Sequence, residues 1–372
     1  MIRMVDLKTQ YENIREEIDR AVLDVIASTD YINGPAVKTF QAELEAYHNI
    51  DHVIPCANGT DALQIAMMAL DLKPGDEIIV PAFTYVATAE VMALLGLTPI
   101  MVDVDPDTFN LPVEQVEAAI TPRTRAIVPV HLFGQSVDME PLLQLAQQHH
   151  LFVIEDNAQA IGASYEFSNG TRKKTGAMGH VGCTSFFPSK NLGCYGDGGA
   201  ITTYDADLAQ RLRMVANHGQ NKQYHHAIVG VNSRLDSIQA AILSVKLKRL
   251  DAYCAARRQA ADYYDAAFAD MPQLKTPVRA ANSSHVFHQY TLVVQDGDRD
   301  ALRQHLTDRQ IPAMIYYPIP LYKQKAFEKY WSGAELPVTE ALCRTVISLP
   351  MHTELTPAIQ DRIVGAVRDY FK

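Results

Sequence analysis

The sequence predicts an α/β protein with a mainly parallel sheet in a large first domain and a smaller α+β domain at the C-terminal end. Short apolar runs alternate with helical patterns up to about residue 215. A long helical stretch then begins near Asp236 and ends the alternation. The remainder mixes strand and helix patterns, so we expect domains at residues 1–245 and 246–372.

The elements of the first domain follow in chain order after an amphipathic helix expected over Lys8–Ala27. Apolar runs bounded by turns predict strands over His52–Ala57, Glu77–Val80, Thr98–Val102, Ala126–Val130, Phe152–Glu155, Thr184–Phe187 and Ala200–Thr203. The intervening patterns predict helices near Asp61–Leu70, Ala87–Leu95, Val113–Ala119, Met139–His149 and Ala206–Asn217. This order favours parallel strands with helices on both faces of the sheet.

The second domain starts from the helical stretch SIQAAILSVKLKRLDAYCAARRQAADYYDAAF. One clear strand follows at Tyr290–Val294, and helices are expected near Arg299–Arg309 and Pro357–Tyr370. A single strand pattern among helices is typical of a small α+β unit.

Charge and hydropathy restrict the possible partners. The chain has 33 basic and 43 acidic residues, a net charge of −10, and no dense Lys/Arg run, which argues against nucleic acid and anionic membranes. No apolar run approaches the roughly 18 residues of a membrane span, and the start lacks a signal-peptide pattern. We therefore expect a cytoplasmic protein without membrane association.

The sequence predicts neither disulfides nor a metal site. Its five cysteines are dispersed and form no C-x-x-C pair, which favours buried reduced thiols. The adjacent pairs His149–His150 and His225–His226 lack the i, i+4 spacing with which two imidazoles share a metal on a helix.

Ligands of an open parallel sheet bind at the carboxyl ends of its strands, and the segment CANGTDALQIAMMAL follows one such strand. Asn58–Gly59 turns the chain and a helix begins near Thr60, so free N–H groups would face an anion. Gly59 permits close approach and Thr60 adds a hydroxyl. The alternative is an ordinary helix cap by Thr60 or Asp61.

A second polar position is Asp156 in FVIEDNAQAIGA, which follows an apolar strand and requires a partner if it is buried. A pyridinium nitrogen would serve, since a carboxylate beside it keeps the ring protonated and electron-withdrawing. Gln159, three residues on, could reach the same ligand. The alternatives are a helix-capping Asp156 and a solvent-facing Gln159.

The third position is Lys190 in CTSFFPSKNLGCYGDGGAI, which lies in a glycine-rich loop between two apolar runs and follows Ser185. A lysine in such an open stretch can condense with an aldehyde when burial or a nearby cation lowers its pKa. The alternative is a solvated loop lysine. A nucleotide-binding glycine loop is not supported, because neither G-x-x-x-x-G-K-[ST] nor a strand–G-x-G-x-x-G–helix pattern is present.

Together these segments resemble the DegT/DnrJ/EryC1/StrS family of pyridoxal-phosphate sugar aminotransferases, which have the aspartate aminotransferase fold (fold type I). The resemblance covers nearly the whole chain. Its motifs, in order, are DLK, YINGPAV, NGTDAL, PAFTYVATAE, VIEDNAQAIGA, SFFPSKNLGCYGDGGA, RMVANHG, VNSRLDSIQAAIL, YYPIPLYKQ and SLPMH.

The resemblance implies roles for individual residues. The catalytic pair would be Lys190, the Schiff-base lysine, and Asp156, the partner of the pyridine nitrogen, with Gln159 near the phenolic oxygen of the ring. The family's phosphate-binding positions match Gly59, Thr60 and Ser185. Tyr85 falls where the family stacks an aromatic ring on the cofactor, although core packing would also suit it. The resemblance also implies a homodimer with a shared active site, in which Asn232 reaches the phosphate from the partner subunit.

A lysine at position 190 favours transamination over dehydration, because the related sugar dehydratases carry histidine there. The resemblance implies L-glutamate as the amino donor, pyridoxamine phosphate as the alternate cofactor form and a nucleotide-linked keto-sugar as acceptor. A dehydratase and a non-catalytic binding or regulatory protein on the same scaffold are the alternatives.

The strings YHHAIVGVNSRLD and CTSFFPSK look closest to the subgroup that aminates C3 of a UDP-linked 2-acetamido-2-deoxy-hex-3-uluronic acid for bacterial surface polysaccharide (O-antigen). Arg234 would pair with the uronate carboxylate, or else form a surface ion pair. Further candidates for substrate contacts are His218, Tyr224, His226, Tyr316 and Tyr317. Many relatives read HYP where this chain has YYP and carry histidine at Tyr322, so a dTDP- or GDP-linked 3- or 4-keto-6-deoxy sugar is the alternative substrate.

Overall fold

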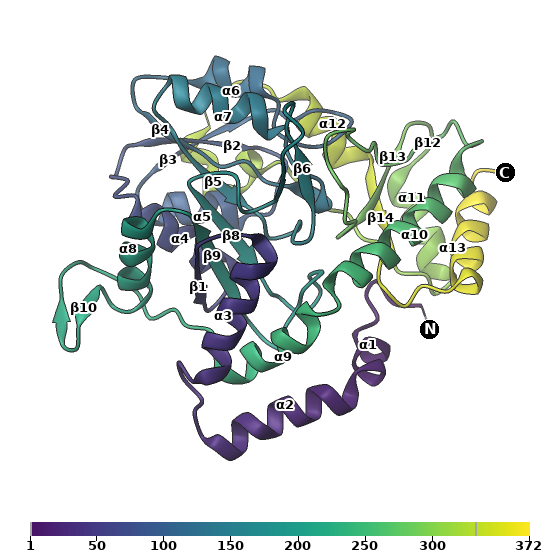
Figure 1. Ribbon diagram of the computed structural model, residues 1–372. Helices are drawn as coiled ribbons and strands as arrows, with labels where there is room; N and C mark the ends of the chain where they lie inside the picture. The colour runs from purple at the N-terminus through teal and green to yellow at the C-terminus, as the bar shows by residue number, and fades with distance from the viewer. Residues whose placement is uncertain (1, 332) are drawn as a thin grey trace.

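The computed structural model describes residues 2–331 and 333–372, and it begins with three helices, α1 (Leu7–Asn13), α2 (Arg15–Ser28) and α3 (Pro35–His48) (Figure 1). The single helix expected over Lys8–Ala27 is divided at Ile14, whose backbone leaves the helical region. Helix α3 was not predicted. It begins with proline at its first position and ends at Asn49 in the left-handed conformation, as helices commonly do.

The central sheet has seven strands in the order β1-β9-β8-β5-β4-β2-β3. The strands are β1 (His52–Cys56), β2 (Glu77–Pro81), β3 (Thr98–Val102), β4 (Thr124–Ile127), β5 (Phe152–Asp156), β8 (Val181–Ser185) and β9 (Gly199–Thr203). Strand β9 runs antiparallel to both of its neighbours, and the other pairs are parallel. The predicted α/β class with a mainly parallel sheet is therefore confirmed.

Two strands begin and end earlier than expected. Strand β4 covers Thr124–Ile127 and not Ala126–Val130. The run Thr184–Phe187 was predicted as a strand, but β8 covers Val181–Ser185. Val181 and Cys183 are buried in the sheet, whereas Phe187 is half exposed beyond its end. The apolar side chain of Phe187 therefore belongs to the loop that follows, not to the sheet.

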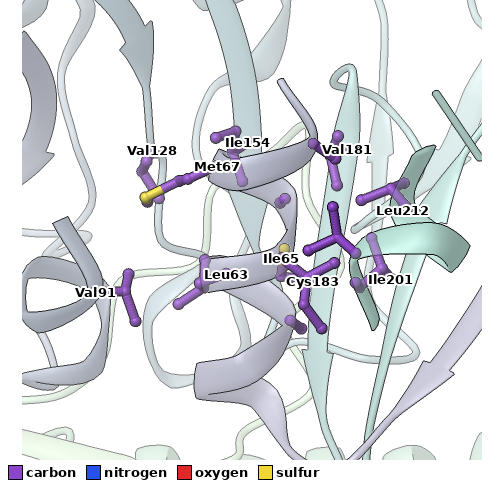
Figure 2. Close-up of a cluster of buried hydrophobic side chains, with 14 of the residues drawn as sticks. Leu63, Ile65, Met67, Val91, Val128, Ile154, Val181, Cys183, Ile201 and Leu212 are labelled. Atoms are coloured by element: carbon purple, nitrogen blue, oxygen red, sulfur yellow. The ribbon is translucent and has the colours of Figure 1, made fainter. Parts of the chain in front are cut away.

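Alternate side chains of the strands are buried on opposite faces of the sheet. Ile78 and Val80 join the cluster formed with α4 (Gly59–Ala69), α5 (Ala87–Leu94) and α8 (Ala206–Ala216), while Ile79 joins the cluster formed with α6 (Val113–Ala119) and α7 (Met139–Gln148). Figure 2 shows the first cluster, in which Leu63, Ile65 and Met67 of α4 pack against the strands. This packing fixes the start of α4 against the sheet.

The long helical stretch after Asp236 forms two helices, α9 (Ser237–Leu247) and α10 (Leu250–Phe268). They lead to a three-stranded antiparallel sheet of β12 (Leu274–Lys275), β13 (Tyr290–Val294) and β14 (Val346–Leu349), of which only β13 was predicted. The helices α11 (Arg299–Asp308) and α13 (Pro357–Tyr370) pack with α10 around it, and α12 (Pro337–Thr345) precedes β14 (Figure 1).

The C-terminal part also returns to the large sheet. Leu321 and Phe327 pack against Ala89 of α5, and Tyr316 and Tyr317 pack near Phe83. The two parts are thus interleaved in space, and the division at residues 245 and 246 stays a prediction.

The chain also contains two short hairpins. Strands β6 (Ser164–Glu166) and β7 (Arg172–Lys174) form the first, and β10 (Gln220–Lys222) and β11 (His225–His226) form the second. The second hairpin projects from the body of the molecule next to α8 (Figure 1). All five cysteines are buried and unpaired. None of the helices in the described ranges is long and apolar enough to span a bilayer.

Candidate active site

A cavity of about 780 Å³ lies at the carboxyl ends of the central strands. Asp156 ends β5 and Ser185 ends the neighbouring parallel strand β8, while Asn58 and Thr84 lie in the segments after β1 and β2. The lining residues are Asn58, Gly59, Thr60, Asp61, Leu63, Thr84, Tyr85, Ala87, Val130, Asp156, Ala158, Gln159, Ser185, Phe187, Ser189, Lys190, Asp197, His288, Gln289, Tyr316 and Tyr317.

The turn between β1 and α4 presents the start of the helix to the cavity. Asn58 caps α4, with its side-chain oxygen accepting a hydrogen bond of 2.8 Å from the N–H of Asp61. The alternative of a cap by Thr60 or Asp61 is therefore wrong. A Cβ added to Gly59 would lie 2.6 Å from the Cβ of Ser185, so only glycine permits the close approach of this turn to β8.

Asp156 is a buried carboxylate held by neutral donors. Its Oδ2 accepts a hydrogen bond of 2.7 Å from the Thr88 hydroxyl, and its Oδ1 accepts one of 3.1 Å from the N–H of Ala158. A turn follows it, so the alternative of a helix cap is wrong. Within the described chain Asp156 makes no ion pair, and a protonated ring nitrogen of a ligand would supply the missing cation.

Gln159 is buried and joins two parts of the cavity wall, which excludes the solvent-facing alternative. Its Oε1 accepts a hydrogen bond of 2.8 Å from the N–H of Phe133, and its Nε2 donates one of 3.0 Å to the phenol oxygen of Tyr317. Burial raises the pKa of Tyr317, which keeps this phenol neutral.

Tyr85 lies at the mouth of the cavity. Its side chain is 56% exposed, and the centre of its ring lies 6.2 Å from that of Tyr317. This exposure contradicts the alternative role in core packing and leaves a ring face free for a ligand.

Lys190 lies on the loop that connects β8 to β9. Ser185 and Gly199 are register partners at the two ends of this loop, and the N–H of Phe186 donates a hydrogen bond of 2.7 Å to the carbonyl of Gly198. Burial lowers the pKa of Lys190 to about 8, although the negative charge of Asp156 opposes the shift. A neutral amine is therefore available near neutral pH, contrary to the alternative of a solvated lysine.

Two buried basic side chains, which have no acidic partner among the described residues, bind backbone carbonyls near the cavity, and sequence patterns did not reveal them. Lys246 donates a hydrogen bond of 2.5 Å to the carbonyl of Gly193 in the Lys190 loop, and burial lowers its pKa to about 8. Arg257 of α10 donates to the carbonyls of Phe287, His288 and Met351 at 3.0, 3.3 and 3.1 Å.

Five predicted site residues lie outside the cavity of their own chain: His218, Tyr224, His226, Asn232 and Arg234. They belong to the segment between α8 and α9 that includes the β10–β11 hairpin. His218, His226 and Asn232 are exposed, and Tyr224 is 83% exposed at the hairpin.

Other residues that line the cavity or contact its lining were not predicted. His288 lines the cavity with 5% exposure, and its Nδ1 has no hydrogen-bond partner among the described residues. The hydroxyl of Thr84 is likewise buried without a partner in that part of the chain. Thr88, the hydrogen-bond donor to Asp156, lies inside a helix and carries no sequence signal of its own.

The donor set fits an aromatic ligand that carries an aldehyde, a basic ring nitrogen and a phosphate, as pyridoxal phosphate does. Asp156 would pair with the ring nitrogen and Lys190 would meet the aldehyde. Gly59, Thr60 and Ser185 provide a close turn, two hydroxyls and the start of a helix for the phosphate.

The model of the DegT/DnrJ/EryC1/StrS aminotransferase family matches residues 12–368. The UDP-2-acetamido-2-deoxy-3-oxo-D-glucuronate aminotransferase of Pseudomonas aeruginosa is 46% identical over 358 residues, which cover 96% of this chain and 97% of the relative. A DegT DnrJ EryC1 StrS aminotransferase from Brucella abortus superposes with a TM-score of 0.95 at 43% identity, covering 100% and 99% of the two chains.

A structure of NtdA from Bacillus subtilis with bound pyridoxamine phosphate superposes with a TM-score of 0.88 at 32% identity, covering 96% of this chain and 82% of that one. These similarities confirm the expected fold. The chain belongs to the DegT/DnrJ/EryC1/StrS aminotransferase family.

Proposed function

We propose that this protein is a pyridoxal-phosphate-dependent aminotransferase that transfers the amino group of L-glutamate to C3 of a UDP-linked 2-acetamido-2-deoxy-hex-3-uluronic acid, for bacterial surface polysaccharide. The observation that carries the proposal is the meeting of Lys190, Asp156 and the Gly59–Ser185 contact in one cavity. The 46% identity to a relative named for amination of this kind of sugar supports the substrate.

Different residues of the cavity would bind different groups of the cofactor. When bound, pyridoxal phosphate supplies an aldehyde that exchanges amines and a ring that withdraws electrons. Asp156 would hold the proton on the ring nitrogen, while Thr60 and Ser185 would bind the phosphate at the start of α4. Gln159, fixed by Phe133 and Tyr317, would direct its amide to the ring oxygen.

Lys190 would move the proton during catalysis. Its pKa of about 8 lets Nζ accept a proton from the substrate carbon and return it at physiological pH. The closure of its loop by β8 and β9 keeps the amine at the cavity, where the negative charge of Asp156 acts on its pKa.

The anionic substrate requires more positive charge than one chain offers. Among the described residues that line the cavity, Lys190 is the only lysine or arginine, and Asp61, Asp156 and Asp197 are acidic. A nucleoside diphosphate and a uronate carboxylate need cationic partners. We propose that a second copy of the chain contributes to the site, with Arg234 as the cationic partner of the carboxylate and Asn232 as a neutral hydrogen-bond donor to the cofactor phosphate.

The amino donor and acceptor can be tested by spectroscopy. The purified protein should be yellow, and L-glutamate should convert it to the pyridoxamine phosphate form with a blue shift of the absorbance. This form is then incubated with UDP-, dTDP- and GDP-linked keto-sugars. Only the UDP-linked 3-keto uronate should restore the yellow form efficiently. A neutral UDP-linked 3-keto sugar with the same 2-acetamido group is the matched control, and restoration by a dTDP- or GDP-sugar alone would contradict the assigned substrate.

The shared site can be tested by mixing Lys190→Ala, which should be inactive, with Arg234→Ala, which should have a raised KM for the uronate substrate. After the two variants are unfolded and refolded together, the activity at a uronate concentration well below the wild-type KM should exceed that of either variant alone, since a mixed dimer contains one intact site. Separate refolding of each variant is the control. A mixture no more active than Arg234→Ala alone, although mixed dimers form, would contradict the sharing of residues.

A further inference from the structure

The contact between Thr88 and Asp156 ties a helix to the candidate acid of the site. Thr88 is the second residue of α5 and is fully buried. Its hydroxyl donates a hydrogen bond of 2.7 Å to Oδ2 of Asp156, while the N–H of Ala158 donates to Oδ1. Each carboxylate oxygen therefore has one fixed donor, and the two donors together set the plane of the carboxylate.

Helix α5 holds the Thr88 hydroxyl in a defined place. Val91 and Met92 pack in the cluster beneath the central sheet, and Ala89 packs against Leu321 and Phe327 on the other side. The helix is thus fixed by two apolar clusters, and with it the backbone that carries the Thr88 hydroxyl. Thr88 itself does not line the cavity.

We propose that Thr88 is a positioning residue that aims the carboxylate of Asp156 at the ring nitrogen of the cofactor. This inference rests on the cofactor named under the proposed function. Charge-assisted hydrogen bonds are among the stronger ones in proteins, and a carboxylate fixed in plane binds a ring N–H without first losing rotational freedom. Thr88 therefore contributes to cofactor affinity although it touches no part of the cofactor.

The test compares the affinity of the full-length apoprotein for two ligands. One is pyridoxal phosphate, and the other is its carbocyclic analogue with CH in place of the ring nitrogen. Thr88→Val removes the hydroxyl at nearly constant volume, and Thr88→Ser retains it. Equilibrium titrations followed by fluorescence quenching give the dissociation constants, and circular dichroism confirms that each variant is folded.

We expect Thr88→Val to weaken the binding of pyridoxal phosphate roughly tenfold, as for the loss of one charged hydrogen bond. Thr88→Ser should keep the wild-type affinity. The affinity for the analogue should be the same in Thr88→Val and in the wild type, since the analogue has no ring N–H for Asp156 to bind.

Thr339 provides a matched control in the same chain. It is also a fully buried threonine whose hydroxyl donates a hydrogen bond of 2.7 Å to a buried aspartate, Asp103, but the pair lies outside the cavity. Thr339→Val should lower thermal stability and leave cofactor affinity unchanged.

Two results would overturn the inference: wild-type affinity of Thr88→Val for pyridoxal phosphate, or an equal loss of affinity for both ligands. If Thr88→Val does not fold, Thr88→Ala is judged by the same two criteria against Thr339→Ala. Failure of the wild-type protein to bind pyridoxal phosphate would instead contradict the proposed function itself, so the two failures are distinguishable.

Discussion

Gln159 and Tyr317 are joined by a hydrogen bond of 3.0 Å between the amide Nε2 and the phenol oxygen, across 158 positions of sequence. The same amide accepts from the backbone of Phe133 through Oε1. One side chain therefore connects the loop after β4, the loop after β5 and the segment before α12. Its orientation fixes the relative position of the cofactor-facing and C-terminal walls of the cavity.

Tyr317→Phe should loosen this connection. The variant keeps the aromatic ring but leaves the Gln159 amide without its acceptor, which should cost about 1 kcal/mol in the free energy of unfolding. We also expect kcat/KM to fall by about tenfold, because the amide is no longer held in place. Urea unfolding and steady-state kinetics measure the two effects. Wild-type kinetics together with wild-type stability would contradict the role of this hydrogen bond.

Lys190→Ala should abolish turnover and leave the fold intact. The lysine is the proposed proton carrier, and loss of such a group typically reduces the rate by about 10²–10⁴-fold. Its loop remains closed by the pairing of Ser185 with Gly199, so we expect the unfolding midpoint to change little. Single-turnover kinetics with L-glutamate and thermal unfolding are the measurements. Normal turnover would exclude the assigned role.

The rate of cofactor uptake by the apoprotein should rise as the pH increases through about 8. Burial lowers the pKa of Lys190 to about 8, so the amine is protonated and unreactive below this pH and neutral above it. Stopped-flow absorbance after addition of pyridoxal phosphate gives the rate at each pH. A rate that rises only near the ordinary lysine value of 10.5 would show that burial does not shift this amine.

Arg234→Ala should act selectively on uronate substrates. Loss of a charged contact to the carboxylate should raise KM by about 10–100-fold with a UDP-linked 3-keto uronate, and should leave a neutral 3-keto sugar almost unaffected. Kinetics with the two sugars in parallel provide the comparison. An equal loss with both would count against a carboxylate partner and favour a structural ion pair.

Glu155→Gln should destabilise the fold. The Glu155 carboxylate is fully buried, accepts hydrogen bonds from the N–H groups of Gly176, Met178 and Gly179 at 2.8, 2.7 and 2.6 Å, and lies 2.9 Å from Nε2 of His131. The substitution replaces one acceptor oxygen of the carboxylate by an NH₂ group, which is a donor and would face the backbone N–H groups or the imidazole N–H that now donate to Glu155. We expect a loss of about 2–4 kcal/mol in the free energy of unfolding, measured with urea.

The same residue predicts a dependence on pH. Burial raises the pKa of Glu155, but the hydrogen bonds from His131, Gly179 and Met178 outweigh it and hold the pKa below its ordinary value of 4.5. Because the folded-state pKa is lowered, this stabilisation is present above pH 4.5 and is lost as the pH falls through the folded-state value. Acid unfolding should therefore be less steep in Glu155→Gln than in the wild type. Identical slopes would contradict this linkage.

Much of the large sheet could be predicted because its buried strands are continuous apolar runs bounded by turns. The strand at Tyr290–Val294 was located to the residue for the same reason. Strand β14 was missed because its four residues, Val346–Leu349, directly follow a helix and have no turn signal before them. The order of strands, and with it the reversal of β9, depends on pairings between distant segments that no local pattern encodes.

The candidate site, too, could be predicted only in part from the sequence. Asp156 and Lys190 are charged side chains that come directly after or close to apolar runs, so they could be selected from the sequence. Thr88 resembles any threonine of an apolar helix, and His288 belongs to a distant part of the chain that only folding brings to the cavity. The residues of the β10–β11 hairpin were selected by resemblance. They are exposed and lie outside the cavity of their own chain.

The antiparallel direction of β9 determines how the loop that carries the Lys190 amine is anchored. Because the loop leaves and re-enters the sheet at the same pair of residues, where Ser185 faces Gly199, the sheet anchors both of its ends. A movement of β12, β13 and β14 relative to the large sheet would reach this loop through Asn191, whose side chain donates a hydrogen bond of 3.0 Å to the carbonyl of Val286. The position of the amine therefore depends on two anchors, the large sheet at both ends of the loop and the C-terminal part through Asn191.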